Sequence, residues 1–231
     1  FKGVDIEDGL VTSYFDKLIQ IPLRVPRLGV NEVKAYLALL LTELAVRKET
    51  LTPKVQSQGQ TALLKLLKTA WGTGISREAL DVAFDAEKHR IGKELDIADQ
   101  LASLLVTSPD IAGNPRLIKR FMNQLMIRLT VAKAMEMPLA IEALVKVQLL
   151  ERCASTAAFE FFSKQVATGQ DGKAGFLVDA EKAAAEGADY APPDLSWTGS
   201  FYEQWVKLNP RLADEDLRPI LHLSRDRSMG L

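Results

Sequence analysis

Basic side chains cluster where the sequence predicts the start of a helix. The segment contains Gly113, Asn114, Pro115, Arg116, Lys119, Arg120 and Asn123. Asn114 is a preferred N-cap residue and Pro115 a preferred first helical residue, so a helix should begin here. The helix dipole makes Asp or Glu favourable in the first turn, yet the chain has Arg116 there. Arg116 and the free backbone N–H groups of the first turn could together bind an anion such as a phosphate.

The same helix has a basic face and an apolar face. Arg116, Arg120 and Asn123 fall within about 60° of one another at 100° per residue. The apolar stripe on the other side comprises Ile118, Phe121, Met122, Leu125, Met126 and Leu129. Basic residues on an amphipathic helix are also typical of a solvated surface. Spacing alone therefore leaves two interpretations open, a phosphate site and a solvated face.

The composition limits the class of ligand. The 231 residues are 47% hydrophobic and 26% charged, which is typical of a globular chain with one large or two small cores. The net charge of −1 creates no overall field, so anion binding must be local. We therefore favour a small phosphate ligand, and nucleic acid is an unlikely partner because no aromatic platform accompanies the arginines.

The sequence predicts neither a metal site nor a membrane span. Cys153 is the single cysteine, and the two histidines, His89 and His222, have no metal-ligand spacing with it or with acidic residues. The longest apolar stretch, 35–41, is far shorter than a membrane span. No signal peptide is evident, and we expect a cytoplasmic protein. The chain starts at Phe1 without methionine, and we expect it to be a piece of a longer polypeptide.

Other catalytic motifs fail on their spacing. Gly172-Lys173 resembles a phosphate-binding loop, but Ala167 and Ala174 stand where a Walker A motif needs Gly and Ser or Thr. Gly72-Thr73-Gly74 has no third glycine. Paired carboxylates such as Glu94 and Asp96 are typical of solvated helix faces. No catalytic set is therefore predicted from these residues.

Hydrophobic periodicity predicts a mainly α fold. One short strand is expected at Ile19–Pro26, as a remnant of a sheet, and a polar loop at Thr50–Gln60. An alanine-rich helix at Val178–Ala188 is expected to be peripheral, and a final aromatic helix should span Trp197–Leu208. The remaining helices are expected at 29–47, 61–70, 76–86, 91–106, from 114 onward, 139–152 and 156–166.

Two blocks of the chain resemble the KAP family of P-loop NTPases, which is part of the AAA+/STAND group. The first block is residues 14–26, YFDKLIQIPLRVP, and the second is residues 113–123, GNPRLIKRFMN. In that family the first block looks like the last core strand leading into a helical lid. The second resembles the sensor-2 segment of the lid. Residues 144–152 and 216–225 also look like family C-terminal segments.

The resemblance implies three regions and a role for the basic helix. Residues 1–28 would end the nucleotide-binding core, 29–136 would form the helical lid, and 137–231 a helical C-terminal extension. Arg116 would be the sensor arginine that reaches the terminal phosphate of ATP, with Asn114, Lys119 and Arg120 as further cofactor-binding candidates. ATP and Mg²⁺ would be held mainly by residues outside this chain, because it has no Walker A motif and no acidic Walker B strand. This fragment alone should not hydrolyse ATP.

The resemblance also suggests partners. The Leu217-Arg218-Pro219 and Leu223-Ser224-Arg225 segments are similar to those of family members in bacterial antiphage defence, such as the ATPase of Qat-type systems. Protein partners of a defence system and a homo-oligomer are implied in the same way. The rival hypothesis is a nonenzymatic helical module in which Arg24, Arg27, Arg116 and Arg120 engage an acidic partner protein.

Overall fold

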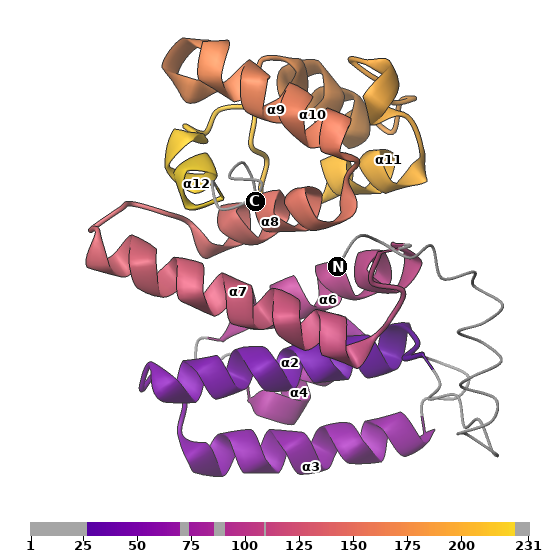
Figure 1. Ribbon diagram of the computed structural model, residues 1–231. Helices are drawn as coiled ribbons and strands as arrows, with labels where there is room; N and C mark the ends of the chain where they lie inside the picture. The colour runs from indigo at the N-terminus through magenta and orange to yellow at the C-terminus, as the bar shows by residue number, and fades with distance from the viewer. Residues whose placement is uncertain (1–26, 70–73, 86–90, 109, 225–231) are drawn as a thin grey trace, which may run out of the picture.

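The protein is a helical bundle in the part that the computed structural model describes, residues 27–69, 74–85, 91–108 and 110–224 (Figure 1). This part contains ten α-helices, two short 3-10 helices and no strand. The α-helices are α2 (Val30–Arg47), α3 (Pro53–Thr69), α4 (Arg77–Phe84), α6 (Gly92–Thr107), α7 (Pro115–Ala134), α8 (Ile141–Cys153), α9 (Thr156–Thr168), α10 (Phe176–Glu186), α11 (Ser200–Lys207) and α12 (Arg218–Leu223). The predicted mainly α class is confirmed.

The lower half of the molecule in Figure 1 is built on the pairing of α2 with α6. Both helices bury apolar residues at steps of three and four, such as Leu37 and Leu41 in α2 and Leu101 and Leu105 in α6. Helices α3 and α4 pack beside them. Polar contacts fix the arrangement, because Lys34 of α2 forms an ion pair with Asp99 of α6 at 2.6 Å.

The upper half contains α9, α10 and α11 (Figure 1). An aromatic cluster lies between these helices. Trp197 lies at its centre, fully buried, with the Phe176 ring centroid 4.8 Å away and the Trp205 centroid 5.6 Å away. The Trp197 indole N–H donates to the Ala158 carbonyl at 3.0 Å, so the buried polar atom is satisfied. Helix α12 returns from this half to contact α7 and α9.

The predicted loop at Thr50–Gln60 is wrong, because α3 begins at Pro53. Thr52 caps the helix: its carbonyl accepts from Gln56 N at 3.1 Å, and its hydroxyl accepts from Val55 N at 3.4 Å. A Thr before a Pro is a helix-start signal that the polar composition concealed. Gly59 is buried in the helix because the Phe84 ring of α4 packs against it. A Cβ at this position would overlap that ring.

Two predictions for the C-terminal part also need correction. Trp197–Leu208 is not one helix: a 3-10 helix ends at Trp197, Gly199 adopts a φ of 116°, and α11 starts at Ser200. Helix α10 is not peripheral, since Leu177, Ala180 and Glu181 are buried. The predicted strand at Ile19–Pro26 and Arg24 lie outside the described residues.

Candidate functional site

The predicted start of α7 is confirmed. Asn114 has extended backbone angles, and its side-chain oxygen accepts a hydrogen bond from Arg116 N at 3.0 Å. Pro115 is the first helical residue and needs no donor partner. The Asn114 side chain is therefore an N-cap, with its amide N–H₂ group left to contact a ligand.

A backbone contact ties the beginning of the described chain to this helix end. Leu28 N donates to the Gly113 carbonyl at 3.1 Å, and Gly113 N donates to the Leu105 carbonyl at 3.0 Å. Gly113 has a φ of 66°, and a Cβ on it would overlap the Leu28 carbonyl oxygen. Glycine is required here by conformation and by space. The chain that precedes residue 27 thus joins the bundle three residues before Arg116.

The basic face of α7 lies open to solvent. Arg116, Lys119, Arg120 and Asn123 are all exposed. Within the described residues, the three cationic side chains form no ion pair and no side-chain hydrogen bond. Helix α7 contains no Asp or Glu that could neutralise them. The structure therefore places four of the predicted site residues at one helix end, with the cations available to an anion.

A fourth α7 cation is buried and has partners. Arg128 Nη1 lies 2.6 Å from Glu151 Oε2 of α8, and both side chains are almost fully enclosed. Gln148 of α8 donates to the Phe121 carbonyl at 2.8 Å and lies beside Arg128. This pair fastens α7 to α8.

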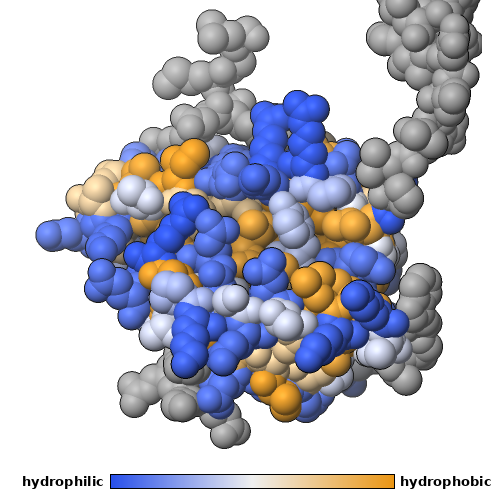
Figure 2. Space-filling view, turned by 90° about the horizontal axis from the view of Figure 1, so that it is seen from below, coloured by the Kyte–Doolittle hydropathy of each residue, from blue (hydrophilic) through white to orange (hydrophobic). Residues whose placement is uncertain are grey.

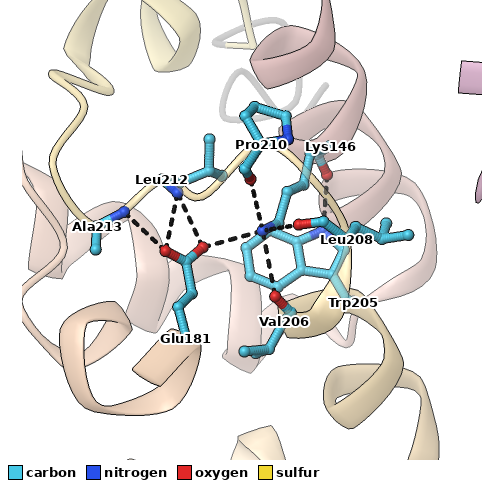
Figure 3. A network of polar contacts seen from close by, with 8 residues as sticks. All are labelled: Lys146, Glu181, Trp205, Val206, Leu208, Pro210, Leu212 and Ala213. Atoms are coloured by element: carbon cyan, nitrogen blue, oxygen red, sulfur yellow. Dashed lines mark hydrogen bonds and ion pairs between the residues drawn. The ribbon is translucent and has the colours of Figure 1, made fainter. Parts of the chain in front are cut away.

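A second buried ion pair joins α8, α10 and the chain after α11 (Figure 3). Lys146 Nζ lies 3.0 Å from Glu181 Oε1 and also donates to the carbonyls of Leu208 and Pro210, at 2.7 and 3.0 Å. The Glu181 carboxylate accepts from Leu212 N at 2.9 Å and from Ala213 N at 3.1 Å. Every hydrogen of the Lys146 ammonium group therefore has an acceptor.

The environment of Lys146 indicates a structural role. Burial lowers the pKa of the ammonium group, and the charge of Glu181 opposes that shift. The Trp205 ring lies beneath it, 5.0 Å from ring centroid to Nζ, and the indole N–H donates to the Lys146 carbonyl at 2.7 Å. The cavity that reaches Lys146 measures about 10 Å³, the size of one water molecule. No substrate could approach the amine.

The sequence reasoning missed both buried pairs. Lys146, Gln148 and Glu151 interrupt a run in α8, Ala143–Glu151, in which every residue is buried. Where a helix is apolar on all its sides, a polar residue within it is expected to have a buried partner. The partners of Lys146 lie 35 to 64 residues away, however, and spacing does not identify them.

Comparison with known families matches residues 2–132 to the KAP family P-loop domain. The match covers more than half of the 231 residues, and the chain belongs to this family. It includes the whole lower half of the bundle and α7 up to Ala132. No curated protein and no solved structure matches the chain.

Two further findings concern ligands and membranes. Within the described ranges, no three His, Cys, Asp or Glu side chains gather as a metal ion would need. No helix among the described residues is long and apolar enough to cross a membrane.

Proposed function

We propose that this chain is the helical lid and C-terminal extension of a KAP-type ATPase, and that Arg116 senses the terminal phosphate of ATP. Residues 29–136 form the lid and 137–231 the extension in this proposal. One observation carries it: Arg116 is exposed and forms no ion pair with the described residues, at a capped helix start beside the point where the preceding chain joins the bundle. A nucleotide-binding core attached through residues 1–28 would lie next to that arginine.

The physical chemistry of the helix end supports phosphate binding. A guanidinium group makes charge-assisted hydrogen bonds to phosphate oxygens, and the positive end of the helix dipole adds to the attraction. Arg116 would contact the terminal phosphate, while Lys119, Arg120 and the Asn114 amide would contribute secondary contacts. Loss of the phosphate after hydrolysis would remove these contacts and release the lid. Hydrolysis would thereby be coupled to a movement of the lid.

The residues of this chain fit ATP phosphates better than Mg²⁺. Helix α7 has five basic and no acidic residues, whereas Mg²⁺ prefers carboxylates and phosphate oxygens. The metal would be held by residues outside this chain, where it would neutralise phosphate charge. The sequence contains no Walker A motif, so the fragment alone should bind the nucleotide weakly and not hydrolyse it.

The broader role in this proposal is coupling of hydrolysis to partner interactions. The extension would pass lid motion to protein partners in the cytoplasm, within a homo-oligomer or a bacterial antiphage defence system. The support is the resemblance of residues 216–225 to family members of that kind, together with the direct contact of α12 with α7.

The test compares two alanine variants of the complete protein. Arg116→Ala should reduce ATP turnover strongly, while Lys133→Ala, an exposed cation in the last turn of the same helix, should leave turnover unchanged. ATP hydrolysis is measured with each, and the circular dichroism melting curve shows that both remain folded. Equal turnover of Arg116→Ala and the unmodified protein would contradict the sensor role.

The rival function is a nonenzymatic module that binds an acidic partner through the same face. The exposure of Arg27, Arg116 and Arg120 favours it. It predicts that the complete protein lacks ATP binding and that the arginine variants weaken partner capture only. ATP binding by the complete protein would exclude it.

A further inference from the structure

A second surface lies along α7 and begins at Arg120, the last of the proposed phosphate contacts. Arg120, Gln124, Ile127, Val131 and Met135, which is the residue after the helix, follow one another at steps of four, three, four and four. They fall within about 80° on the helix and extend over about 22 Å. We call these five residues the α7 stripe. The three apolar members are 64%, 40% and 54% exposed, respectively.

The α7 stripe borders a groove that α12 closes on one side. The groove holds about 280 Å³. Its lining comprises Gln124, Ile127, Arg128, Val131 and Met135 of α7 and its C-cap, and His222 and Leu223 of α12. Exposed apolar residues at helical spacing beside a groove are typical of a site for another protein surface. The α3 side of the molecule differs. On the α3 side, hydrophobic side chains form small separate patches among hydrophilic ones (Figure 2).

Charge is segregated between α7 and the C-terminal extension. Helix α7 has five Lys and Arg residues and no acidic residue. Residues 155–217 contain eleven Asp and Glu against five Lys and Arg, and all of these acidic side chains except Glu181 are exposed. One molecule thus carries a basic and apolar helix and, elsewhere, a segment with an excess of exposed acidic side chains.

The acidic surface contains a recess. A hollow of about 330 Å³ lies between the end of α10 and α11, and its polar lining comprises Asp189, Tyr190, Glu203 and Lys207, two carboxylates against one ammonium group. Asp189 and Glu203 are exposed, and neither takes part in an ion pair among the described residues. An arginine side chain fits such a recess, because two carboxylates can neutralise it and the tyrosine ring can stack on the guanidinium plane.

We propose that the α7 stripe of one molecule docks on the acidic surface around Asp189 and Glu203 of a second copy of this chain. Arg120 enters the acidic hollow, which leaves Arg116, Lys119 and Asn114 for the phosphate, and Ile127, Val131 and Met135 are covered by the neighbouring molecule. The contact joins two different surfaces, so it is heterologous and leaves one free copy of each surface on a dimer. A symmetric contact between two α7 stripes is disfavoured because neither supplies a carboxylate to the other's Arg120.

The first experiment measures the self-association of the 231-residue chain by sedimentation velocity over a range of concentrations. Association should weaken as salt is added, because the charged contacts are screened. Ile127→Asp with Val131→Asp should weaken it at least about tenfold by placing charges in an apolar contact. Val82→Asp, at a residue of α4 that is 84% exposed, is the matched control and should have no effect.

The second experiment tests the acidic surface. Asp189→Asn with Glu203→Gln should weaken self-association by a similar factor. Asp214→Asn with Glu215→Gln, which neutralises two other exposed acidic residues of the extension, should not. An equal effect of both double variants would contradict the assignment of the hollow.

Mixing the two double variants tests whether the contact joins two different surfaces. The stripe variant and the Asp189/Glu203 variant should each be monomeric alone, while their mixture should form a dimer, because one intact stripe meets one intact acidic surface. Three results would overturn the proposal: a wild-type chain that is monomeric throughout, a stripe variant that still associates, or a mixture that stays monomeric. None of them bears on the sensor role of Arg116, which is measured by ATP turnover.

Discussion

Lys146 and Arg116 are two cations of the same chain that differ in burial and in hydrogen-bond partners. Lys146 is 1% exposed and has a carboxylate and two short carbonyl contacts for its three hydrogens. Arg116 is exposed, forms no ion pair within the described residues, and lies at the helix end where a positive charge is least favourable. A cation whose partners are all supplied by the fold stabilises the fold. A cation without a partner at an unfavourable position is the better candidate for a ligand.

The largest effect should come from breaking the buried pair. Lys146→Met leaves the Leu208 and Pro210 carbonyls without their donor and the Glu181 charge without its counterion. We expect the free energy of unfolding to fall by about 3–5 kcal/mol, measured by urea denaturation. Adding Glu181→Leu should cost less than the sum of the two single changes, because the two groups interact. Additive effects would show that they do not.

The next largest effect should be on the rate of ATP hydrolysis. In the complete protein, Arg116→Ala should reduce ATP turnover by about 100-fold, which is typical for loss of one group that stabilises transition-state charge. Arg116→Lys should give an intermediate rate, since lysine keeps the charge but loses the two-pronged contact. Turnover is measured at saturating ATP. A lysine variant no better than alanine would show that the charge by itself contributes little.

A smaller effect should follow from removing the cap. Asn114→Ala removes the acceptor of the Arg116 N–H, and the free energy of unfolding should fall by about 1 kcal/mol. Asn114→Asp keeps the acceptor and should remain close to the unmodified protein in a thermal melt. Comparable losses in both variants would mean that the cap hydrogen bond does not stabilise α7.

The smallest effect concerns a cation that is exposed but paired. The Arg218 guanidinium donates to both oxygens of Asp216 at 2.9 and 2.7 Å and lowers the pKa of that carboxyl group. Because the folded-state pKa lies below the unfolded one, the contribution is present above about pH 4 and is lost as the pH falls through the folded pKa. Asp216→Asn should therefore slightly reduce the acid dependence of unfolding, measured by circular dichroism. Solvent screening keeps the effect small.

Local chemistry could be predicted from the sequence, whereas distant pairing could not. Asn114 and Pro115 form their cap with neighbours in the chain, so the start of α7 was identified correctly. The α2 and α6 helices followed from apolar periodicity. The second half of α3 was predicted as a helix, but the first half was assigned to a loop because of its polar composition and Gly59, although the glycine is needed for contact with Phe84.

The buried pairs and the α7 groove depend on tertiary packing. Lys146 meets Glu181 only after α8 and α10 are brought together, and His222 reaches the α7 groove from almost 90 residues beyond Met135. The exposure of Arg116 agrees with the predicted basic face, but its proposed ligand would be held mainly by residues outside this chain. The sensor role and the three domain boundaries therefore stay predictions.

The link between Leu28 and Gly113 has a mechanical consequence. A pull on the chain at residue 27 acts on the Leu28–Gly113 hydrogen bond and, through the Gly113–Leu105 bond, on the end of α6. Force from any preceding domain is thereby shared among the starts of α2 and α7 and the end of α6, instead of unwinding α2 alone. The two hydrogen bonds therefore couple the ends of three helices to one another, next to the basic end of α7.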